Sequence, residues 1–325
     1  MKKHTVSSLL RLLPWLAVIV AALLLSRRNY PAMVLCTMGI YVIAVSGLDI
    51  LFGYSGQISF GNAAFYLIGA YTSALLSKEL GIPPFVSMLC GAALAMLVGA
   101  IVAFPACKLV HHFLSFLTIA FGNIMYNLVA NLKFTGRTIG ITGIPKMSFF
   151  GYVLDTKTKY FVFVLAVAAI MLLLKYRIIN SRVGRAFIAI RDNTHAANGC
   201  GVNIRKYKVL AFAISAFYAG IAGGVYAHLL NFISPDAFRT STSVLFMTML
   251  LFGGMGSFVG PVIGSVVLTL VQNWLQVFSI YQMLVYALFL LLVLYFMPNG
   301  VKGLFDRGAA LIKRIRSKTG GAEKC

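Results

Sequence analysis

The sequence lacks the groupings of titratable residues from which catalytic and metal-binding sites are built. Only 7 of its 325 residues are Asp or Glu, against 28 Lys and Arg. No titratable residues stand in pairs at a spacing that suggests acid–base chemistry, and His111-His112 has no metal-ligand spacing. We therefore expect no catalytic residue, no metal site and no cofactor bound by this chain.

Two further motifs are missing. There is no G-x-x-x-x-G-K-[ST], so the chain cannot cradle nucleotide phosphates by that route. None of the five cysteines makes a C-x-x-C pair, and three lie within or beside apolar runs, which is typical of small buried hydrophobes rather than of metal or disulfide sites. The cysteines are Cys36, Cys90, Cys107, Cys200 and Cys325.

The chain has far more apolar residues than a soluble domain. Hydrophobic residues make up 60% of the sequence and the mean hydropathy is +0.90, whereas soluble domains are about 45–50% apolar. We therefore predict an all-α polytopic membrane protein. The net charge of +21 does not indicate a nucleic-acid partner, because the Lys and Arg residues lie between and beyond the apolar runs, where they set topology.

Apolar runs of about 20 residues are long enough to cross a bilayer as helices. The sequence has ten candidates, of which about eight to ten are expected to be transmembrane helices. They are Leu9–Leu25, Ala32–Leu51, Phe60–Ser77, Pro84–Phe104, Phe113–Leu132, Tyr160–Lys175, Val209–Leu230, Ser243–Gly253, Val259–Val277 and Gln282–Met297. We predict an N-terminal first span over 1–31, a core over 32–302 and a basic tail over 303–325.

The distribution of positive charge predicts the orientation. With the N-terminus inside, alternation of the spans places 19 Lys and Arg residues on the cytoplasmic side and 9 on the outer side, which obeys the positive-inside rule. Both termini and the basic segment 175–208 are then cytoplasmic, and the Gly- and Thr-rich loop 133–159 is outside. A loop of that length is usually functional or mobile.

The segment 175–208 is polar and basic in an otherwise apolar chain, with eight Lys and Arg against one acid, Asp192. Asn180-Ser181 is predicted to cap a short helix. Its apolar residues Val183, Phe187 and Ile190 form one stripe, and such a helix can lie along the inner membrane surface.

A second short helix is predicted to follow. A cap among residues 192–194 precedes Ala196-Ala197, and Gly199 and Gly201 end the helix, because glycine tolerates a left-handed turn. Two interpretations fit the whole segment: a solvated connector whose charges set topology, or a dock in which small residues let another protein's backbone approach.

A glycine-rich segment begins at Gly53. Glycines break any straight helix here, and Gln57, Ser59 and Asn62 place polar groups at or near membrane depth. Irregular backbone is tolerated there only when it is buried in protein or lines a watery cavity. A translocation pathway at these four residues and a simple packing bend both fit.

Two titratable residues stand within or at the ends of apolar runs. Asp49 precedes the glycine-rich segment, and an intramembrane acid is a functional candidate by default, so we add it to the pathway residues. A position at the inner headgroup level is the alternative. His228, near the outer end of its predicted span, is a functional candidate for the same reason.

A second glycine-rich segment predicts helix packing. Gly256, Gly260 and Gly264 recur every four residues, and Gly220 and Gly224 do so once. Small residues at this spacing let membrane helices approach closely. A hinge that lines a pore is the alternative.

Over roughly residues 33–300, the chain resembles the permease subunit of branched-chain amino acid ABC importers of the LivM type. Three stretches are similar to that family as a set. They are Gly53–Phe65 with Gly69-Ala70-Tyr71; Thr135–Pro145; and Gly184-Arg185-Ala186 with Ile190-Arg191-Asp192, Ala196-Ala197, Gly201-Val202-Asn203 and Tyr207-Lys208.

The resemblance implies a non-catalytic, multi-pass subunit of a bacterial cytoplasmic-membrane importer that works by alternating access. It also implies several partners: a second related permease, two ABC ATPases that use ATP and Mg²⁺, and an extracytoplasmic substrate-binding protein. The ATPase would dock on a coupling helix in 175–208. The residues implied are Arg191, Asp192, Ala196, Ala197, Gly201 and Val202.

Six positions depart from the family pattern, two of which are Arg137 and Ile139 in the outer loop, where small or polar residues are common. Asp49 stands where Asn is usual and Asn62 where His is usual, which leaves urea, short amides or other amino acids as alternative cargoes. His195 stands where Glu is common and Asn198 where an acid is common, which weakens a charge contact to the ATPase.

An ion-coupled secondary transporter is the alternative of another class. It predicts ionisable residues buried at mid-membrane and internal inverted repeats. Apart from Asp49 and His228, the predicted spans are almost free of such residues, and no clear repeat is visible.

Overall fold

The computed structural model describes residues 29–107, 111–149, 152–275 and 291. The predicted first span Leu9–Leu25 and the basic tail 303–325 lie outside these residues, as does the predicted span Gln282–Met297 except for Leu291. The described part is an all-α membrane protein with little sheet.

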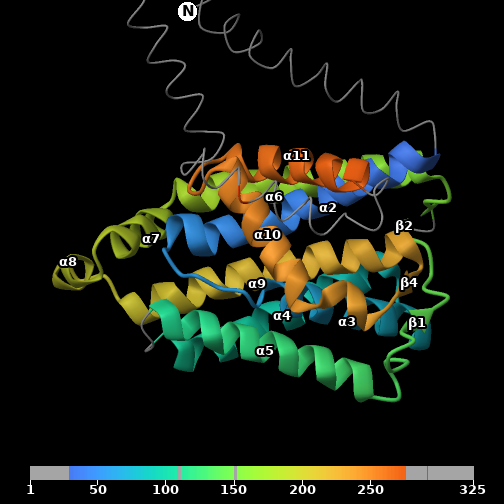
Figure 1. The fold of residues 1–325 in the computed structure, drawn as a ribbon, viewed down its shortest axis with the longest axis horizontal. Coiled ribbons are helices and arrows are strands. Elements are labelled where there is room, and N and C mark those ends of the chain that lie inside the picture. The colour runs from blue at the N-terminus through green and yellow to red at the C-terminus, as the bar shows by residue number, and fades with distance from the viewer. Residues whose placement is uncertain (1–28, 108–110, 150–151, 276–290, 292–325) are drawn as a thin grey trace, which may run out of the picture.

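The long helices run side by side along one axis (Figure 1). They are α2 (Asn29–Asp49), which continues into the π-helix η1 (Ile50–Tyr54), α3 (Asn62–Glu79), α4 (Pro84–Ala106), α5 (His111–Asn131), α6 (Lys157–Ile179) and α9 (Ile204–Leu230). Two shorter apolar helices, α10 (Thr240–Gly253) and α11 (Gly260–Leu275), follow. Five described stretches are long and apolar enough to cross a membrane: Pro31–Tyr54, Pro84–Ala106, Phe113–Asn131, Lys157–Ile179 and Ile204–Leu230.

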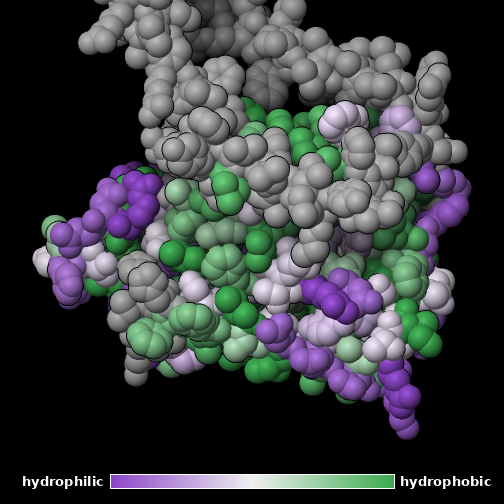
Figure 2. Space-filling view, in the orientation of Figure 1, coloured by the Kyte–Doolittle hydropathy of each residue, from purple (hydrophilic) through white to green (hydrophobic). Residues whose placement is uncertain are grey.

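The two ends of the bundle are built differently. At one end, α7 (Arg182–Asp192) and α8 (Thr194–Gly199) project beyond the long helices (Figure 1). Figure 2 shows hydrophilic side chains gathered over this projection. We call it the inner end, because it contains the segment predicted to be cytoplasmic.

The opposite, outer end contains the predicted outer loop. There β1 (Ile141–Thr142) pairs antiparallel with β4 (Phe232–Ile233). The second ribbon pairs β2 (Ser148–Phe149) with β3 (Tyr152–Val153), and the 3₁₀ turn η2 (Pro235–Phe238) leads into α10. The loop is therefore partly ordered by pairing with the chain after α9.

Close backbone contacts form the interior, where most of α3 is buried. A Cβ atom on Gly69 of α3 would overlap the Gly220 carbonyl of α9, and one on Gly91 of α4 would lie 2.6 Å from the Gly69 carbonyl oxygen. Three backbones meet here because none of the three residues has a side chain.

The outer layer of the bundle exposes apolar side chains, as lipid-facing helices do. Exposed positions on α4, α5 and α6 include Leu89, Leu97, Ile101, Phe113, Phe116, Ile124, Leu128, Val162, Ile170 and Leu173. By contrast, most of α2 and α9 is buried. Helices α2, α3 and α9 are therefore the interior layer.

Several helices extend beyond the predicted spans. Helix α6 continues past Lys175 to Ile179. Lys175, which is predicted to be the last residue of this span, therefore lies within the helix. Helix α9 begins at Ile204, before the predicted Val209, because Asn203 caps it: Asn203 Oδ1 accepts a bond of 3.1 Å from the Lys206 amide.

We expect Gly220→Leu to destabilise the bundle. A Cβ atom at Gly220 would lie 2.8 Å from Ala92 Cα and Ala95 Cβ, so a larger side chain forces α9 away from α4. The free energy of unfolding should fall by about 1–3 kcal/mol, measured by thermal melting in detergent. Gly122→Leu is the control, because a Cβ atom there meets nothing within 4 Å. Equal loss in both variants would contradict the close packing at Gly220.

Candidate functional site

The inner projection consists of two capped helices. Ser181 caps α7, its Oγ accepting a bond of 3.1 Å from the Val183 amide. Asn193 caps α8, its Oδ1 accepting bonds from the His195 amide at 2.9 Å and the Ala196 amide at 3.0 Å. Gly201 follows with a φ of 80°, a conformation that favours glycine. The helix pair predicted from the sequence is therefore confirmed.

The small residues of α8 and of the turn after it differ in their exposure. Ala197 is buried, and its carbonyl accepts a bond of 3.1 Å from the Val202 amide. Ala196, Gly199 and Gly201 are exposed. The surface that a docking protein would reach is thus formed by the exposed set, while Ala197 holds α8 to the bundle.

Helix α7 packs its apolar stripe on protein. Phe187 and Ile190 of its apolar stripe are buried within the bundle, and the Phe187 ring meets the Tyr207 ring edge-on at 6.3 Å. A Cβ atom on Gly184 would overlap the Ile179 carbonyl. The start of α7 therefore packs directly against the end of α6.

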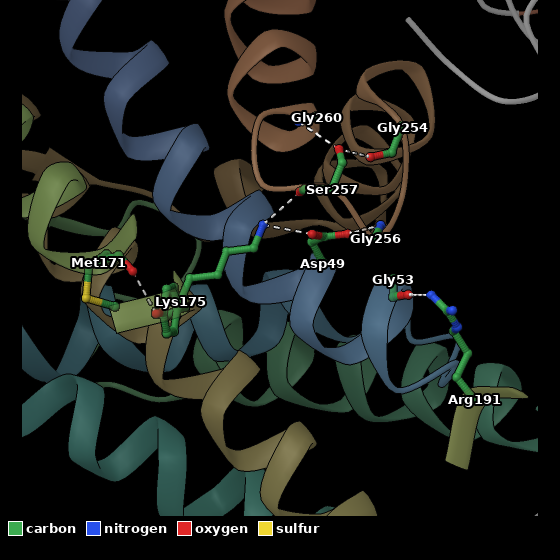
Figure 3. Close-up of polar contacts among 10 residues, drawn as sticks. Asp49, Gly53, Met171, Lys175, Arg191, Gly254, Gly256, Ser257 and Gly260 are labelled. Atoms are coloured by element: carbon green, nitrogen blue, oxygen red, sulfur yellow. Dashed lines mark hydrogen bonds and ion pairs between the residues drawn. The ribbon is translucent and has the colours of Figure 1, made fainter. Parts of the chain in front are cut away.

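An ion pair is buried beneath this turn (Figure 3). Lys175 Nζ donates to Asp49 Oδ2 at 2.7 Å, and both side chains are 0% exposed. Asp49 Oδ1 accepts a bond of 2.8 Å from the Gly256 amide, and Lys175 also donates to the Ser257 carbonyl at 3.3 Å. The Tyr54 ring lies 5.9 Å from Nζ.

This pair corrects the charge count made from the sequence. Lys175 was placed among the cytoplasmic cations of segment 175–208, but it is a buried residue of α6 whose charge is balanced by Asp49. A signal was present in the sequence, because the apolar residues Ile178 and Ile179 follow Lys175 before the Asn180-Ser181 cap. Lys175 therefore lies inside the helix and not at its last position, where the span is predicted to end.

Arg191 lies near the pair and joins α7 to η1. Its Nη1 donates to the Gly53 carbonyl at 2.9 Å, and its Nη2 pairs with exposed Asp192 at 3.0 Å. A Cβ atom on Gly56 would lie 3.0 Å from Arg191 Cγ, and one on Gly256 would lie 3.3 Å from Arg191 Nη1. The two glycine-rich segments therefore meet at one arginine.

The other predicted pathway residues are buried and hydrogen-bonded. Gln57 Nε2 donates to Ser55 Oγ at 2.6 Å and to the Lys208 carbonyl at 3.2 Å. Ser59 Oγ accepts from the Gly61 amide at 3.3 Å, and Asn62 Oδ1 accepts from Ser215 Oγ at 3.4 Å. The irregular backbone between η1 and α3 is thus covered by protein in this conformation.

The predicted packing glycines lie at close contacts of more than one kind. Gly220 and Gly224 of α9 face α4, where a Cβ atom on Gly224 would lie 2.8 Å from Met88 Cγ, and Gly264 of α11 faces the Met249 carbonyl of α10. Gly260 begins α11 against the Gly254 carbonyl. Gly256 lies in the turn before α11 with a φ of 65°, so it belongs to that turn and not to a helical stripe.

His228 orders the outer loop. Its Nε2 lies 2.9 Å from Ser73 Oγ of α3, and its Nδ1 lies 2.8 Å from the Pro145 carbonyl oxygen. Asn231, at the end of α9, donates to the Ile144 carbonyl at 2.9 Å. This buried histidine connects α3, α9 and the loop.

The described residues contain no group of three or more His, Cys, Asp or Glu that could hold a metal ion. The arrangement at the inner end is suited to mechanical linkage: an exposed small-residue surface, a tight helix corner and two cations that reach neighbouring segments.

We expect Lys175→Met to destabilise the protein. The carboxylate of Asp49 would stay buried without its counter-charge, which costs about 3–5 kcal/mol, and thermal melting in detergent measures the loss. Lys146→Met is the matched control, because it breaks an exposed pair with Asp155, at 3.1 Å, of a kind that contributes little. Wild-type melting of Lys175→Met would show that the buried pair is not formed.

A family model described as "Branched-chain amino acid transport system / permease component" matches residues 30–296. The high-affinity branched-chain amino acid transport system permease protein LivM of Escherichia coli (strain K12) is 30% identical over 286 residues, covering 81% of this chain and 67% of that protein.

Two further relatives show the range of the similarity. The protein of the same name from Salmonella typhimurium is 30% identical over 91% of this chain and 75% of its own length. The ribose import permease protein RbsC of Haemophilus influenzae is 27% identical over 77% of this chain and 76% of its own length. No solved structure matches the chain.

Proposed function

The chain belongs to the family of permease components of branched-chain amino acid transport systems, and from that premise we propose that it is the membrane subunit of an ATP-driven importer of branched-chain amino acids. Membership makes the chain a multi-pass membrane permease component and not an enzyme. The observation that supports the proposal most is the extent of the match, which covers the bundle and the inner projection together.

The cargo is proposed from the relatives. Two proteins named for branched-chain amino acid transport are 30% identical over more than four fifths of this chain. The ribose permease of Haemophilus influenzae is 27% identical over a smaller share. The balance favours amino acids, and ribose is the second candidate that a specific observation supports.

The inner projection is the proposed dock for the ATPase. Its exposed small residues Ala196, Gly199 and Gly201 let a partner's backbone approach. ATP and Mg²⁺ would be bound by two ATPase subunits, and a second, related permease would complete the membrane part. Both termini are proposed to be cytoplasmic, and an extracytoplasmic binding protein would deliver substrate to the outer end, where β1 and β4 order the surface.

The pathway role of Gly53, Gln57, Ser59 and Asn62 is likewise a proposal. These residues are buried here, so substrate would reach them only when the inner end of α2 moves. An alternating-access cycle requires such a movement.

We expect proteoliposomes containing this chain with its cognate permease and ATPases to take up radiolabelled L-leucine in the presence of ATP, outer binding protein and Mg²⁺. Excess unlabelled isoleucine should compete, whereas excess ribose or urea should not, because an apolar side chain and a sugar need different contacts. Competition by ribose alone would reassign the cargo.

We expect Ala196→Trp to block docking. An indole at this exposed position prevents close approach to α8 without disturbing buried Ala197, so co-purification with the ATPase should be lost while membrane insertion is kept. Lys133→Trp, at an exposed site on the outer end, is the control and should retain the ATPase. Undiminished co-purification by Ala196→Trp would place the dock elsewhere.

A further inference from the structure

We propose that Lys175 and Arg191 are positioning residues that make the inner end of α2 and the turn 254–257 move together with α7 and α8. The inference rests on the proposed function, because it requires an ATPase that moves the inner projection. The inference adds which bonds transmit movement of the inner projection to the membrane-spanning helices.

The first step is that the two cations lie on one stiff piece of chain, which we call the α6–α7 corner (residues 175–191). Ser181 Oγ donates to the Ile178 carbonyl at 2.7 Å and accepts from the Val183 amide at 3.1 Å. The Gly184 backbone lies directly against Ile179. Because the end of α6 is fixed to the start of α7, Lys175 and Arg191 keep their relative positions.

The second step is that both cations bind the same end of α2. Lys175 binds the Asp49 carboxylate at 2.7 Å, and Arg191 binds the Gly53 carbonyl at 2.9 Å. The two acceptors are separated by one helical turn at the point where α2 becomes the π-helix η1. Figure 3 shows Lys175 reaching Asp49 from one side and Arg191 reaching Gly53 from the other.

The third step is that the turn between α10 and α11 is bound to the same node. The Gly256 amide donates to Asp49 at 2.8 Å, and Lys175 donates to the Ser257 carbonyl at 3.3 Å. Ser257 Oγ in turn accepts from the Gly260 amide at 2.9 Å, at the start of α11. A displacement of the corner is therefore transmitted to α2 and to α11.

The segments held in this way are the ones that depart from regular α-helix. A π-helical turn frequently marks a functional site, and η1 leads into the irregular backbone before α3. The turn has positive φ at Gly254 and Gly256, 103° and 65°. By contrast, α3 and α9 are in direct backbone contact at Gly69 and Gly220. Movement of the corner should therefore displace the inner ends of α2 and α11 relative to a stiff α3–α9 core.

Stability alone does not explain a buried ion pair at this place. An apolar pair of the same volume often stabilises a protein as well or better. What the pair adds is a directional bond, supported on each side by a backbone group of the turn. A linkage needs such bonds, whereas a packed core does not.

The test uses the double variant Asp49→Leu with Lys175→Met, because either single change leaves a buried charge. The double variant should melt close to wild type and assemble with the ATPases and partner permease. Leucine taken up per ATP hydrolysed in proteoliposomes should fall about tenfold or more, within the range of a typical coupling free energy. Wild-type uptake per ATP in this variant would overturn the proposal.

Arg191→Leu tests the second bond. It should also lower uptake per ATP, because the Gly53 carbonyl loses its donor while the docking surface of α8 is unchanged. Arg185→Leu, on an exposed position of the same helix, is the matched control and should keep the wild-type ratio. The same uptake per ATP in Arg191→Leu and Arg185→Leu would contradict the positioning role of Arg191. If both values were lowered equally, the loss would come from removing a positive charge and not from the bond to Gly53.

A second measurement does not depend on the cargo. In the assembled complex, with the five native cysteines replaced by serine, Phe52→Cys places a thiol in η1. Its reaction rate with a maleimide should change when a non-hydrolysable ATP analogue is added, and this change should disappear with the double variant. No ATP-dependent change with the links intact would overturn the inference. Failure of leucine uptake with the rate change preserved would overturn only the proposed cargo.

Discussion

A carboxylate that is fully buried needs a counter-charge within bonding distance, and this requirement fixes the inner half of the molecule. Asp49 meets it through Lys175 at 2.7 Å. The second carboxylate oxygen of Asp49 accepts a bond from the Gly256 amide, and Lys175 donates a second bond to the Ser257 carbonyl. These bonds hold the turn 254–257 at the ion pair. Helices α2 and α6 and the start of α11 are thus held at one node, and the bond from Arg191 to the Gly53 carbonyl holds the end of α7 beside it.

The two ends of the bundle differ in the kind of order they have. The outer end is held by a buried histidine, an asparagine at the end of α9 and a short β-ladder, so its loop is tied to the interior helices. The inner end has a π-helix, an irregular segment and a glycine turn, joined by charged side chains from one corner. A permease that opens to one side at a time needs a stiff scaffold and a deformable gate, and α3–α9 and the inner end are suited to these two roles.

Helix existence could be predicted from the sequence because apolar runs, caps and glycines are local signals. Ser181, Asn193 and Gly201 act as their residue types predict. The pairing of Asp49 with Lys175 could not be predicted, since 126 positions separate them and hydropathy assigns a charged residue to the end of a span. The bond from Arg191 to Gly53 could not be predicted for a related reason. A basic residue in a polar segment is expected to be solvated, and the sequence does not show which residues lie near it in space. Likewise, Gly256 shares a four-residue spacing with Gly260, yet only the fold shows that one lies in a turn and the other begins a helix.

The most direct test is an experimental structure of the whole complex in two states, resting and with a non-hydrolysable ATP analogue. The measured quantity is the displacement of the Gly53 carbonyl relative to the α3–α9 core, compared with that of Arg191. The account predicts that both move together and that their bond, 2.9 Å here, is kept in both states. A structure in which α7 shifts while Gly53 stays with α3 and α9 would contradict it.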